Sequence, residues 1–270
     1  MKLTYLGTAA AEGFPAVFCR CKFCREARSL GGKNVRTRSQ ALIDDTLLID
    51  LPADTYAHFL ANGIEGDKIE NLLITHSHGD HFYPNELAMR HGAYAHDMRA
   101  KTLGIYCGEG VYSRLALSLA PNLSLEKILP FDTVQIGDYK VTAFPARHAP
   151  GDGALFYSIE GDRHLLYAHD TGYFYEEVFE FIERKALRFD TVSLDCTNVD
   201  IPVSDEGHHM GIDNLERLVE RLSDIGAFDD NTVIVINHFS HNANPLQTVL
   251  EERVADKGWL VSYDGMTIDV

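Results

Sequence analysis

Three histidines and an aspartate fall close together in this chain, directly after a short apolar run. The run covers residues 72–74, and the cluster consists of His76, His78, Asp80 and His81. An apolar run that gives way to a polar segment with a glycine is typical of a buried strand leading into a loop. Imidazole and carboxylate side chains are ligands that suit zinc, iron and manganese, and a plain surface turn seldom gathers four of them. The sequence therefore predicts a metal-binding loop at the end of a buried strand.

Apolar runs and stretches of helical periodicity alternate along the rest of the chain. We expect strands over residues 3–6, 41–43, 47–49, 72–74, 101–107, 133–136, 139–144, 154–159, 165–167, 190–194, 232–236, 259–262 and 266–269, helices over 55–62, 84–91, 112–119, 174–187, 213–225 and 245–255, and irregular structure over 12–38. Two sets of strands with interspersed helices fit a four-layer αββα sandwich of the mixed α/β class better than a repeated βαβ unit. No repeat or linker-like composition divides the sequence, so we expect one domain over residues 1–270.

Three further residues of metal-binding type each follow a strand-like apolar run. They are His148, Asp170 and His238. Each alone is unremarkable, but side chains at the ends of several strands can converge at one edge of a sheet. Asp170 is the best candidate for a bridging ligand, because the two oxygens of a carboxylate can each reach one ion.

The pattern His-x-His-x-Asp-His, followed by these three residues in this order, resembles the signature of the metallo-β-lactamase superfamily. The resemblance implies the αββα fold and a dinuclear site, in which His76, His78 and His148 hold one divalent ion and Asp80, His81 and His238 hold the other, with Asp170 between them. Two ions about 3.5–4 Å apart can clamp a hydroxide and a substrate oxygen, which is hydrolase chemistry. Oxygen-reducing di-iron relatives carry His-x-Glu-x-Asp instead, and His78 stands in the place of that glutamate. Zinc, manganese and iron all suit these ligands.

A second cluster lies near the start of the chain, where Cys19, Cys21 and Cys24 place three thiols close together. Three thiolates at this spacing can wrap a tetrahedral zinc ion once a fourth ligand arrives. Unrelated buried thiols are the alternative. Because Arg20 and Lys22 lie between the cysteines, an exposed metal-binding loop is favoured.

Candidates for the fourth ligand are Cys107, Cys196 and a histidine, of which His241 is attractive because it comes three residues after His238. The early Cys-x-Cys-x-x-Cys, the histidine motif and this late histidine together resemble the phosphodiesterase branch of the carbon–phosphorus lyase pathway, over nearly the whole chain. The resemblance implies one structural zinc, held by the cysteine cluster and the late histidine, and hydrolysis of a phosphoribosyl cyclic phosphate. It does not fix the natural substrate.

That branch also uses a histidine beside the metals, shortly before the penultimate helix. His208 and His209 both stand in the corresponding place, and His209 is the better match because it is nearer the start of the expected helix. A histidine there can bind a phosphoryl oxygen or protonate a leaving alkoxide, whereas the alternative is a mobile surface loop. The expected catalytic residues are therefore His209 and Asp80, the latter also a metal ligand.

Charge and apolar content restrict the classes of function. A formal net charge of −16 argues against nucleic acid or an anionic membrane as the main partner. The first residues lack the long apolar stretch of a signal peptide and no run approaches a membrane span, so we expect a cytoplasmic protein, in which the five cysteines stay reduced unless they hold metal.

We expect a phosphodiesterase acting on a small cyclic phosphodiester or nucleotide. The sequence is also compatible with a homodimer. Alternatives are a lactone or thioester hydrolase, a tRNA-maturing endonuclease, and a scaffold without turnover. The complete set of seven ligands speaks against the scaffold.

Overall fold

The computed structural model describes residues 1–117 and 119–270, and its strands form two seven-stranded sheets. In the first sheet the strands are β1 (Lys2–Gly7), β2 (Gln40–Ile43), β3 (Leu47–Ile49), β4 (Asn71–Ile74), β5 (Leu103–Cys107), β6 (Leu123–Lys127) and β14 (Thr267–Asp269), in the order β14-β1-β2-β3-β4-β5-β6. In the second they are β7 (Thr133–Ile136), β8 (Tyr139–Pro145), β9 (Leu155–Glu160), β10 (His164–Ala168), β11 (Thr191–Asp195), β12 (Val233–Asn237) and β13 (Leu260–Val261), in the order β13-β12-β11-β10-β9-β8-β7.

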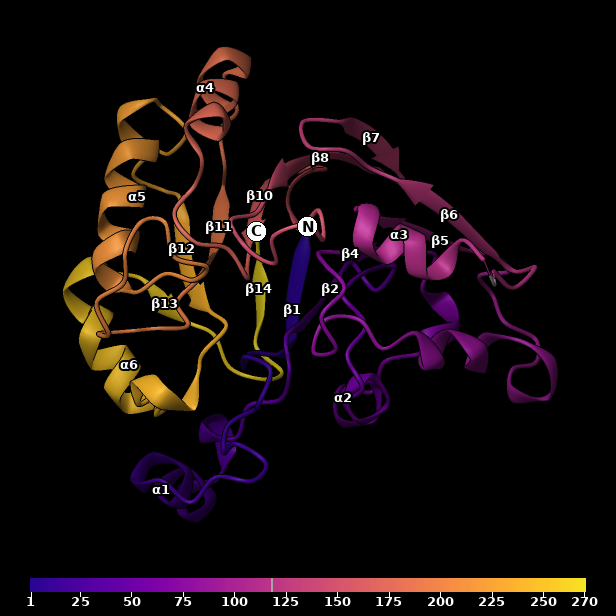
Figure 1. The fold of residues 1–270 in the computed structure, drawn as a ribbon, viewed down its shortest axis with the longest axis horizontal. Coiled ribbons are helices and arrows are strands. Elements are labelled where there is room, and N and C mark those ends of the chain that lie inside the picture. Colours follow the sequence, from indigo (N-terminus) through magenta and orange to yellow (C-terminus); the bar gives the residue numbers. More distant parts are fainter. Residues whose placement is uncertain (118) are drawn as a thin grey trace.

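The described helices pack around the two sheets, and all but the first of them cover an outer face; that first helix packs instead against Ala9, Phe14 and Leu246. The helices are α1 (Lys22–Leu30), α2 (Thr55–Asn62), α3 (Glu109–Leu115), α4 (Glu176–Lys185), α5 (Ile212–Asp224) and α6 (Gln247–Val254). Figure 1 shows α4, α5 and α6 along the second sheet, and α2 and α3 beside the first. The expected αββα sandwich is thus confirmed. Among the described residues, no helix is long and apolar enough to cross a bilayer.

The alternation of side chains along the strands explains why the sheets pack in layers. Leu47 and Ile49 of β3 join the apolar core between the two sheets, whereas Leu48 faces outward. In β4, likewise, Leu73 joins the core between the sheets and Leu72 faces outward. Because successive side chains of a strand point to opposite faces, a strand that is apolar throughout must be covered on both sides.

Strand direction gathers several strand ends at one edge. Strands β3 to β6 are parallel to one another, as are β10 to β13. Strand β8 runs in the same direction as β10, because each is antiparallel to β9. The residues that follow β8, β10, β11 and β12 can therefore meet at one edge of the second sheet, and the loop after β4 of the first sheet lies against them.

Some local predictions were wrong. Residues 12–38, expected to be irregular, contain α1, whose basic residues mask its periodicity in the sequence. The segment expected to be a helix over 84–91 forms the 3-10 turns η3 (Pro84–Arg90). Strand β6 was missed, since its side chains are mostly exposed at the sheet edge. The helix expected over 112–119 begins earlier and ends at Leu115, and residue 118 lies outside the described residues.

Candidate metal centre

Every predicted ligand of the dinuclear site lies just beyond the end of a strand. The loop that carries His76, His78, Asp80 and His81 follows β4. The remaining three, His148, Asp170 and His238, follow β8, β10 and β12. The converging strand ends bring all seven side chains together.

Asp170 lies at the centre of the group, and its side chain is 3% exposed. Its Oδ2 lies 2.9 Å from Nε2 of His81 and 3.2 Å from Nε2 of His76. On the other oxygen, Oδ1 lies 3.4 Å from Nε2 of His238. Asp170 therefore contacts histidines from two different sheets.

Among the described residues, three sets of candidate ligand atoms include Asp170, and within each set all atoms lie within 4.8 Å of one another. One of them joins Asp170 and His238 to Asp195 and His209, and the other two consist of the predicted ligands. The first of these two is His76, His78, His148 and Asp170, and the second is Asp80, His81, Asp170 and His238. These are the same two groups that the family resemblance implies. At the open side, Nε2 of His148 and Nδ1 of His78 face each other at 3.1 Å.

The polar atoms at the centre fit a cation. Nε2 of His76, His81 and His238 and Oδ1 of Asp170 are buried and form no hydrogen bond of proper geometry with any described residue, although the three nitrogens lie 2.9–3.4 Å from the Asp170 carboxylate. An unpaired buried polar atom costs about 1–3 kcal/mol, so four of them converging on one place require a strong compensating interaction. Nitrogen and carboxylate oxygen atoms are the donor set of a divalent transition-metal site.

Protonation favours the same interpretation. Burial lowers the pKa of His148 to about 4, and burial followed by the neighbouring His76 lowers the pKa of His78. Burial alone would raise the pKa of Asp170, but His238 and His81 hold that pKa well below its usual value. Neutral imidazoles and an ionised carboxylate are the forms that bind a metal ion. His81 differs, because Asp50 and then Asp170 raise its pKa well above the usual value although burial opposes this, so a metal ion bound there would displace a proton.

Asp50, which directly follows β3, orients the ligand loop and was missed in the sequence. Its buried carboxylate accepts hydrogen bonds from the backbone N–H of Thr75 at 2.8 Å and contacts Nδ1 of His81 at 2.7 Å. This contact leaves Nε2 of His81 facing Asp170. A carboxylate that fixes the ring of a ligating histidine is a common feature of metal sites.

The backbone is strained where side chains enter the site. Asp50, Asp170 and His238 have φ values of 64°, 52° and 65°, in the left-handed region that residues other than glycine seldom adopt. Such strain costs of order 1–3 kcal/mol at each residue and persists where the surroundings require that conformation. Here it turns the side chain that follows each strand into the space between the sheets.

The structure also places His209 at the centre, and not His208. Nδ1 of His209 lies 3.0 Å from Oδ2 of Asp195 and 3.2 Å from Oδ1 of Asp170, and its ring stacks on His238. The side chain of His208 is exposed, with its ring 6.1 Å from that of His148. Burial opposes protonation of His209, but Asp195 and then Asp170 raise its pKa to about 9.

Asp195, at the end of β11, holds this part of the site together. Its fully buried carboxylate accepts hydrogen bonds from the backbone N–H groups of Asp170, Thr197 and Met210. It therefore positions both the central carboxylate and His209. Nothing in the sequence distinguishes Asp195 from the other aspartates that follow apolar runs.

Replacing Asp195 with asparagine should lower kcat by about 10–100-fold, the usual effect of losing a residue that orients a metal site. In asparagine an NH2 group, which donates hydrogen bonds, replaces one carboxylate oxygen. That group would face the backbone N–H groups that now donate to Asp195. The measurement is kcat and KM with metal content, beside the exposed control Asp138→Asn. Unchanged kcat in Asp195→Asn would contradict the positioning role.

The sequence also matches a known family. A model of the Beta-lactamase superfamily domain matches residues 46–239, a range that holds every residue of the two ligand sets. The chain belongs to the metallo-β-lactamase superfamily. In coarse terms it is a metal-dependent hydrolase of this fold.

Solved structures share the fold over the whole chain. Zn²⁺-bound PqqB from Methylobacterium extorquens is 19% identical, with a TM-score of 0.76 and coverage of 100% of both chains. A diphosphatase from the PhnP family is 20% identical, with a TM-score of 0.74, covering 99% of this chain and 96% of that one. The short form of human tRNase Z is 16% identical, with a TM-score of 0.68, covering 100% of this chain and 99% of that one. At these identities the likeness establishes the fold alone.

One curated relative is an octanoyltransferase from Porphyromonas gingivalis (strain ATCC BAA-308 / W83), 35% identical over 85 residues. The match covers 30% of this chain and 16% of that protein. Because the chain spans only about a sixth of that relative's length, the transferase activity is not carried over.

The three early cysteines and His241 also come together. Their ligand atoms lie within 4.8 Å of one another, and Nδ1 of His241 is 3.7 Å from Sγ of both Cys21 and Cys24. A tetrahedral zinc ion with bonds of about 2.1–2.3 Å separates its ligand atoms by about 3.6–3.8 Å. All three cysteines are free thiols, so no disulfide competes for them.

The setting of these cysteines differs from the exposed loop that was expected. Cys24 is buried inside α1, and Cys21 caps that helix by accepting a hydrogen bond from the N–H of Cys24. Cys107 and Cys196 are buried in separate apolar clusters, so neither supplies the fourth ligand atom. Burial would raise the pKa of Cys21, but the contact with His241 and nearby N–H groups lowers it to about 6.

Replacing Cys21 with serine should remove one zinc ion per chain and lower the Tm by about 5–10 °C, as expected for a loss of a few kcal/mol. The site joins α1 to the loop after β12, so its loss frees one end of the molecule. Elemental analysis and thermal unfolding measure the effect. Cys107→Ser is the matched control, since it also replaces a thiol but should keep the full zinc count. A Cys21→Ser protein with undiminished zinc would contradict this assignment.

Proposed function

We propose that the chain is a dinuclear metal-dependent phosphodiesterase that acts on a small phosphodiester, such as a cyclic phosphate or a nucleotide. The observation that carries this proposal is the central position of Asp170, whose Oδ2 lies 3.2 Å from Nε2 of His76 in one ligand set and 2.9 Å from Nε2 of His81 in the other. A carboxylate so placed can hold two ions close together. When bound, such a pair supplies a nucleophile at neutral pH and neutralises charge on a phosphoryl group.

The protein's own residues then bind the ions and manage a proton. His76, His78 and His148 would hold one ion, and Asp80, His81 and His238 the other. Nδ1 of His209 contacts the carboxylate of Asp195, so Nε2 on the other side of the ring is available to contact a substrate oxygen. A histidine held in this way can donate a proton to a leaving alkoxide, which typically contributes 10²–10⁴-fold to the rate.

Charge favours a small substrate over a long nucleic acid. The net charge of −16 repels a polyanion, whereas a single phosphodiester can be neutralised within the site itself. The PhnP-family diphosphatase and tRNase Z, both named for phosphate chemistry, share the fold, which supports a phosphoryl substrate.

The experiment combines metal analysis with a panel of substrates. Protein reconstituted with Zn²⁺ or Mn²⁺ should hold about two ions at this site, plus the structural zinc. We expect turnover of bis(p-nitrophenyl) phosphate and of cyclic phosphodiesters, with far lower rates on phosphomonoesters, lactones, thioesters and precursor tRNA. Rapid lactone or thioester hydrolysis without phosphodiester cleavage under either metal would reject the proposal, as would preference for precursor tRNA.

A further inference from the structure

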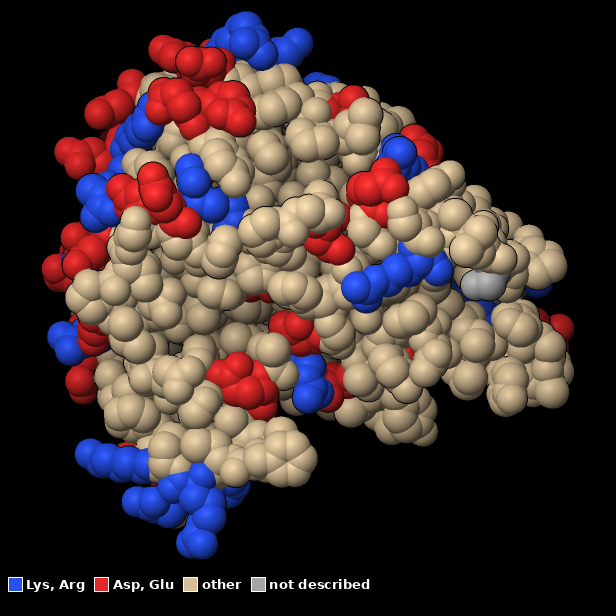
Figure 2. Space-filling model, in the orientation of Figure 1, with Lys and Arg blue, Asp and Glu red and all other residues tan. Residues whose placement is uncertain are grey.

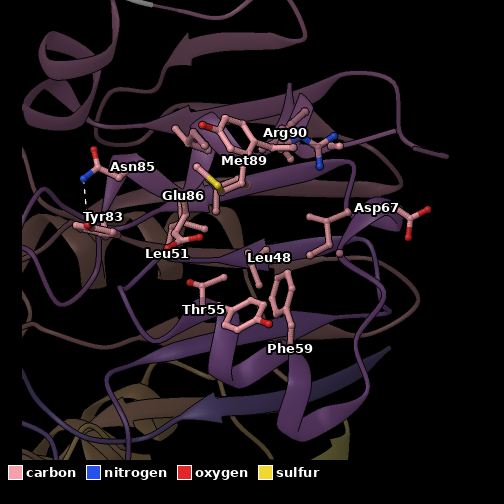
Figure 3. A pocket seen from close by; sticks show the side chains of 18 of the residues that line it. Leu48, Leu51, Thr55, Phe59, Asp67, Tyr83, Asn85, Glu86, Met89 and Arg90 are labelled. Carbon is pink, nitrogen blue, oxygen red and sulfur yellow. Dashed lines mark hydrogen bonds between the residues drawn. The ribbon is translucent and has the colours of Figure 1, made fainter. Parts of the chain in front are cut away.

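A large hollow lies on the outer face of the first sheet and contains none of the metal-site residues. It has a volume of about 1010 Å³ and lies between α2 and the turns η3 and η4 (Gly92–Tyr94) (Figure 3). Its floor is apolar and comes from adjacent strands and the segments beside them. The floor includes Leu48, Leu51, Ile69, Leu72 and Leu103, all less than 9% exposed. Ligand sites in proteins typically measure 300–1000 Å³ and have mostly apolar walls.

The rim of the hollow exposes further apolar side chains. Tyr56 and Tyr94 are each 69% exposed, and Met89 is 45% exposed. On the face that Figure 2 shows, few charged side chains lie around α2 and the η3–η4 turns, in contrast to the helices of the second sheet. Covering apolar surface around a cavity with an apolar ligand is favourable, because it removes that surface from water.

One cationic side chain in this hollow has no ionic partner among the residues that the structure describes. Arg90 lines the cavity, and one of its terminal nitrogens donates to the carbonyl of Ala100 at 3.0 Å. Its Nε is buried without a hydrogen-bond partner within the described part of the chain. The nearby carboxylate of Asp67 is bound by Arg99 at 2.6 Å. Arg90 is left as a partly desolvated cation, and burial lowers its pKa.

A second polar group limits what can bind. Glu86 also lines the hollow, and Figure 3 shows its carboxylate beside Leu51, away from the guanidinium of Arg90. An anion beside Arg90 would gain charge-assisted hydrogen bonds, whereas an anion beside Glu86 would be repelled. The distribution of charge therefore suits a molecule with one anionic end and an apolar body.

We propose that this hollow binds an apolar monocarboxylate, with the carboxylate on Arg90 and the hydrocarbon part across Leu48, Leu72 and Phe59. This site is separate from the metal centre and does not rest on the proposed phosphodiesterase activity. Apolar walls with a single cationic anchor bind such a molecule by hydrophobic burial and orient it by its charge.

The test uses decanoate as the probe, with the metal-loaded full chain in a calorimeter, and compares decanol and decanedioate. Decanoate should bind at one site per chain, and decanedioate should bind more weakly because its second carboxylate meets an apolar floor or Glu86. Arg90→Met should weaken decanoate binding by about 10–100-fold, the usual effect of losing hydrogen bonds to a charged group. The affinity for decanol should change by less than about twofold.

Two further variants complete the test. Arg184→Met removes an exposed arginine on α4 and should leave decanoate binding unchanged. Ala95→Trp, which places an indole at the cavity wall, should abolish binding of decanoate and decanol while Tm stays near the wild-type value. Absence of saturable decanoate binding, or equal affinity in wild type, Arg90→Met and Ala95→Trp, would overturn the proposal. A dimer that Tyr94→Glu separates, in a protein that does not bind decanoate, would assign this face to a second copy of the chain and also overturn it.

Discussion

Replacing Asp170 with asparagine should remove metal from both ligand sets and lower kcat/KM on a phosphodiester by at least about 10³-fold. Asp170 belongs to both predicted ligand sets, and its Oδ2 lies 3.2 Å from Nε2 of His76 in one set and 2.9 Å from Nε2 of His81 in the other. A neutral amide binds a divalent ion more weakly than a carboxylate does, and nucleophile generation and charge stabilisation both depend on the ions. Asparagine is chosen because it tolerates the left-handed φ of 52° at this position better than alanine does.

Asp97 offers a matched control for this variant. It also has a φ of 52° but is exposed and lies outside the ligand sets. Asp97→Asn should therefore retain all metal and full activity. Elemental analysis, circular dichroism and steady-state kinetics on both proteins separate metal loss from misfolding. If Asp170→Asn kept both ions and normal turnover, the bridging assignment would be wrong.

Replacing His209 with alanine should lower kcat by about 10²–10⁴-fold on a phosphodiester with a poor alkoxide leaving group. The loss should be much smaller when the leaving group is p-nitrophenolate, because that group departs without a proton. The structural reason is the contact of Nδ1 with Asp195 at 3.0 Å, which holds the ring beside the ligand sets. Metal content should stay close to that of the wild type, since the two proposed sets do not need His209.

The neighbouring His208 supplies the control for this experiment. Its side chain is exposed, so His208→Ala should retain activity on both classes of substrate. The measurement is the ratio of kcat values for the two leaving groups in each protein. If His209→Ala lowered kcat equally on both substrates, the proton-donor role would be contradicted and a role in binding would remain.

Much of the proposed site could be predicted from the sequence because its chemistry is local. Four candidate ligands occur between His76 and His81, and three thiols occur between Cys19 and Cys24. The other ligands follow apolar strands, and parallel strand ends meet at one edge of a sheet. The αββα fold followed from the same alternation of strands and helices, and the structure confirms it.

The residues that orient the site could not be predicted in this way. Asp50 contacts His81 across 31 positions of sequence, and Asp195 contacts the N–H of Asp170 across 25. Both are single aspartates after apolar strands, a pattern shared by Asp44, which follows β2 but belongs to no candidate ligand set. Their role exists only because neighbouring strands end side by side, which is a property of sheet order.

The sequence by itself determined which chemical groups are present and that they lie at strand ends, because ligand type and strand pattern are encoded in short segments. Only the tertiary structure decided between His209 and His208, selected His241 over Cys107 and Cys196, and left Arg90 in an apolar hollow without a carboxylate partner among the described residues. These outcomes depend on distances between segments that are remote in sequence. Such distances are set by how sheets and helices pack, and no local pattern of residues carries them.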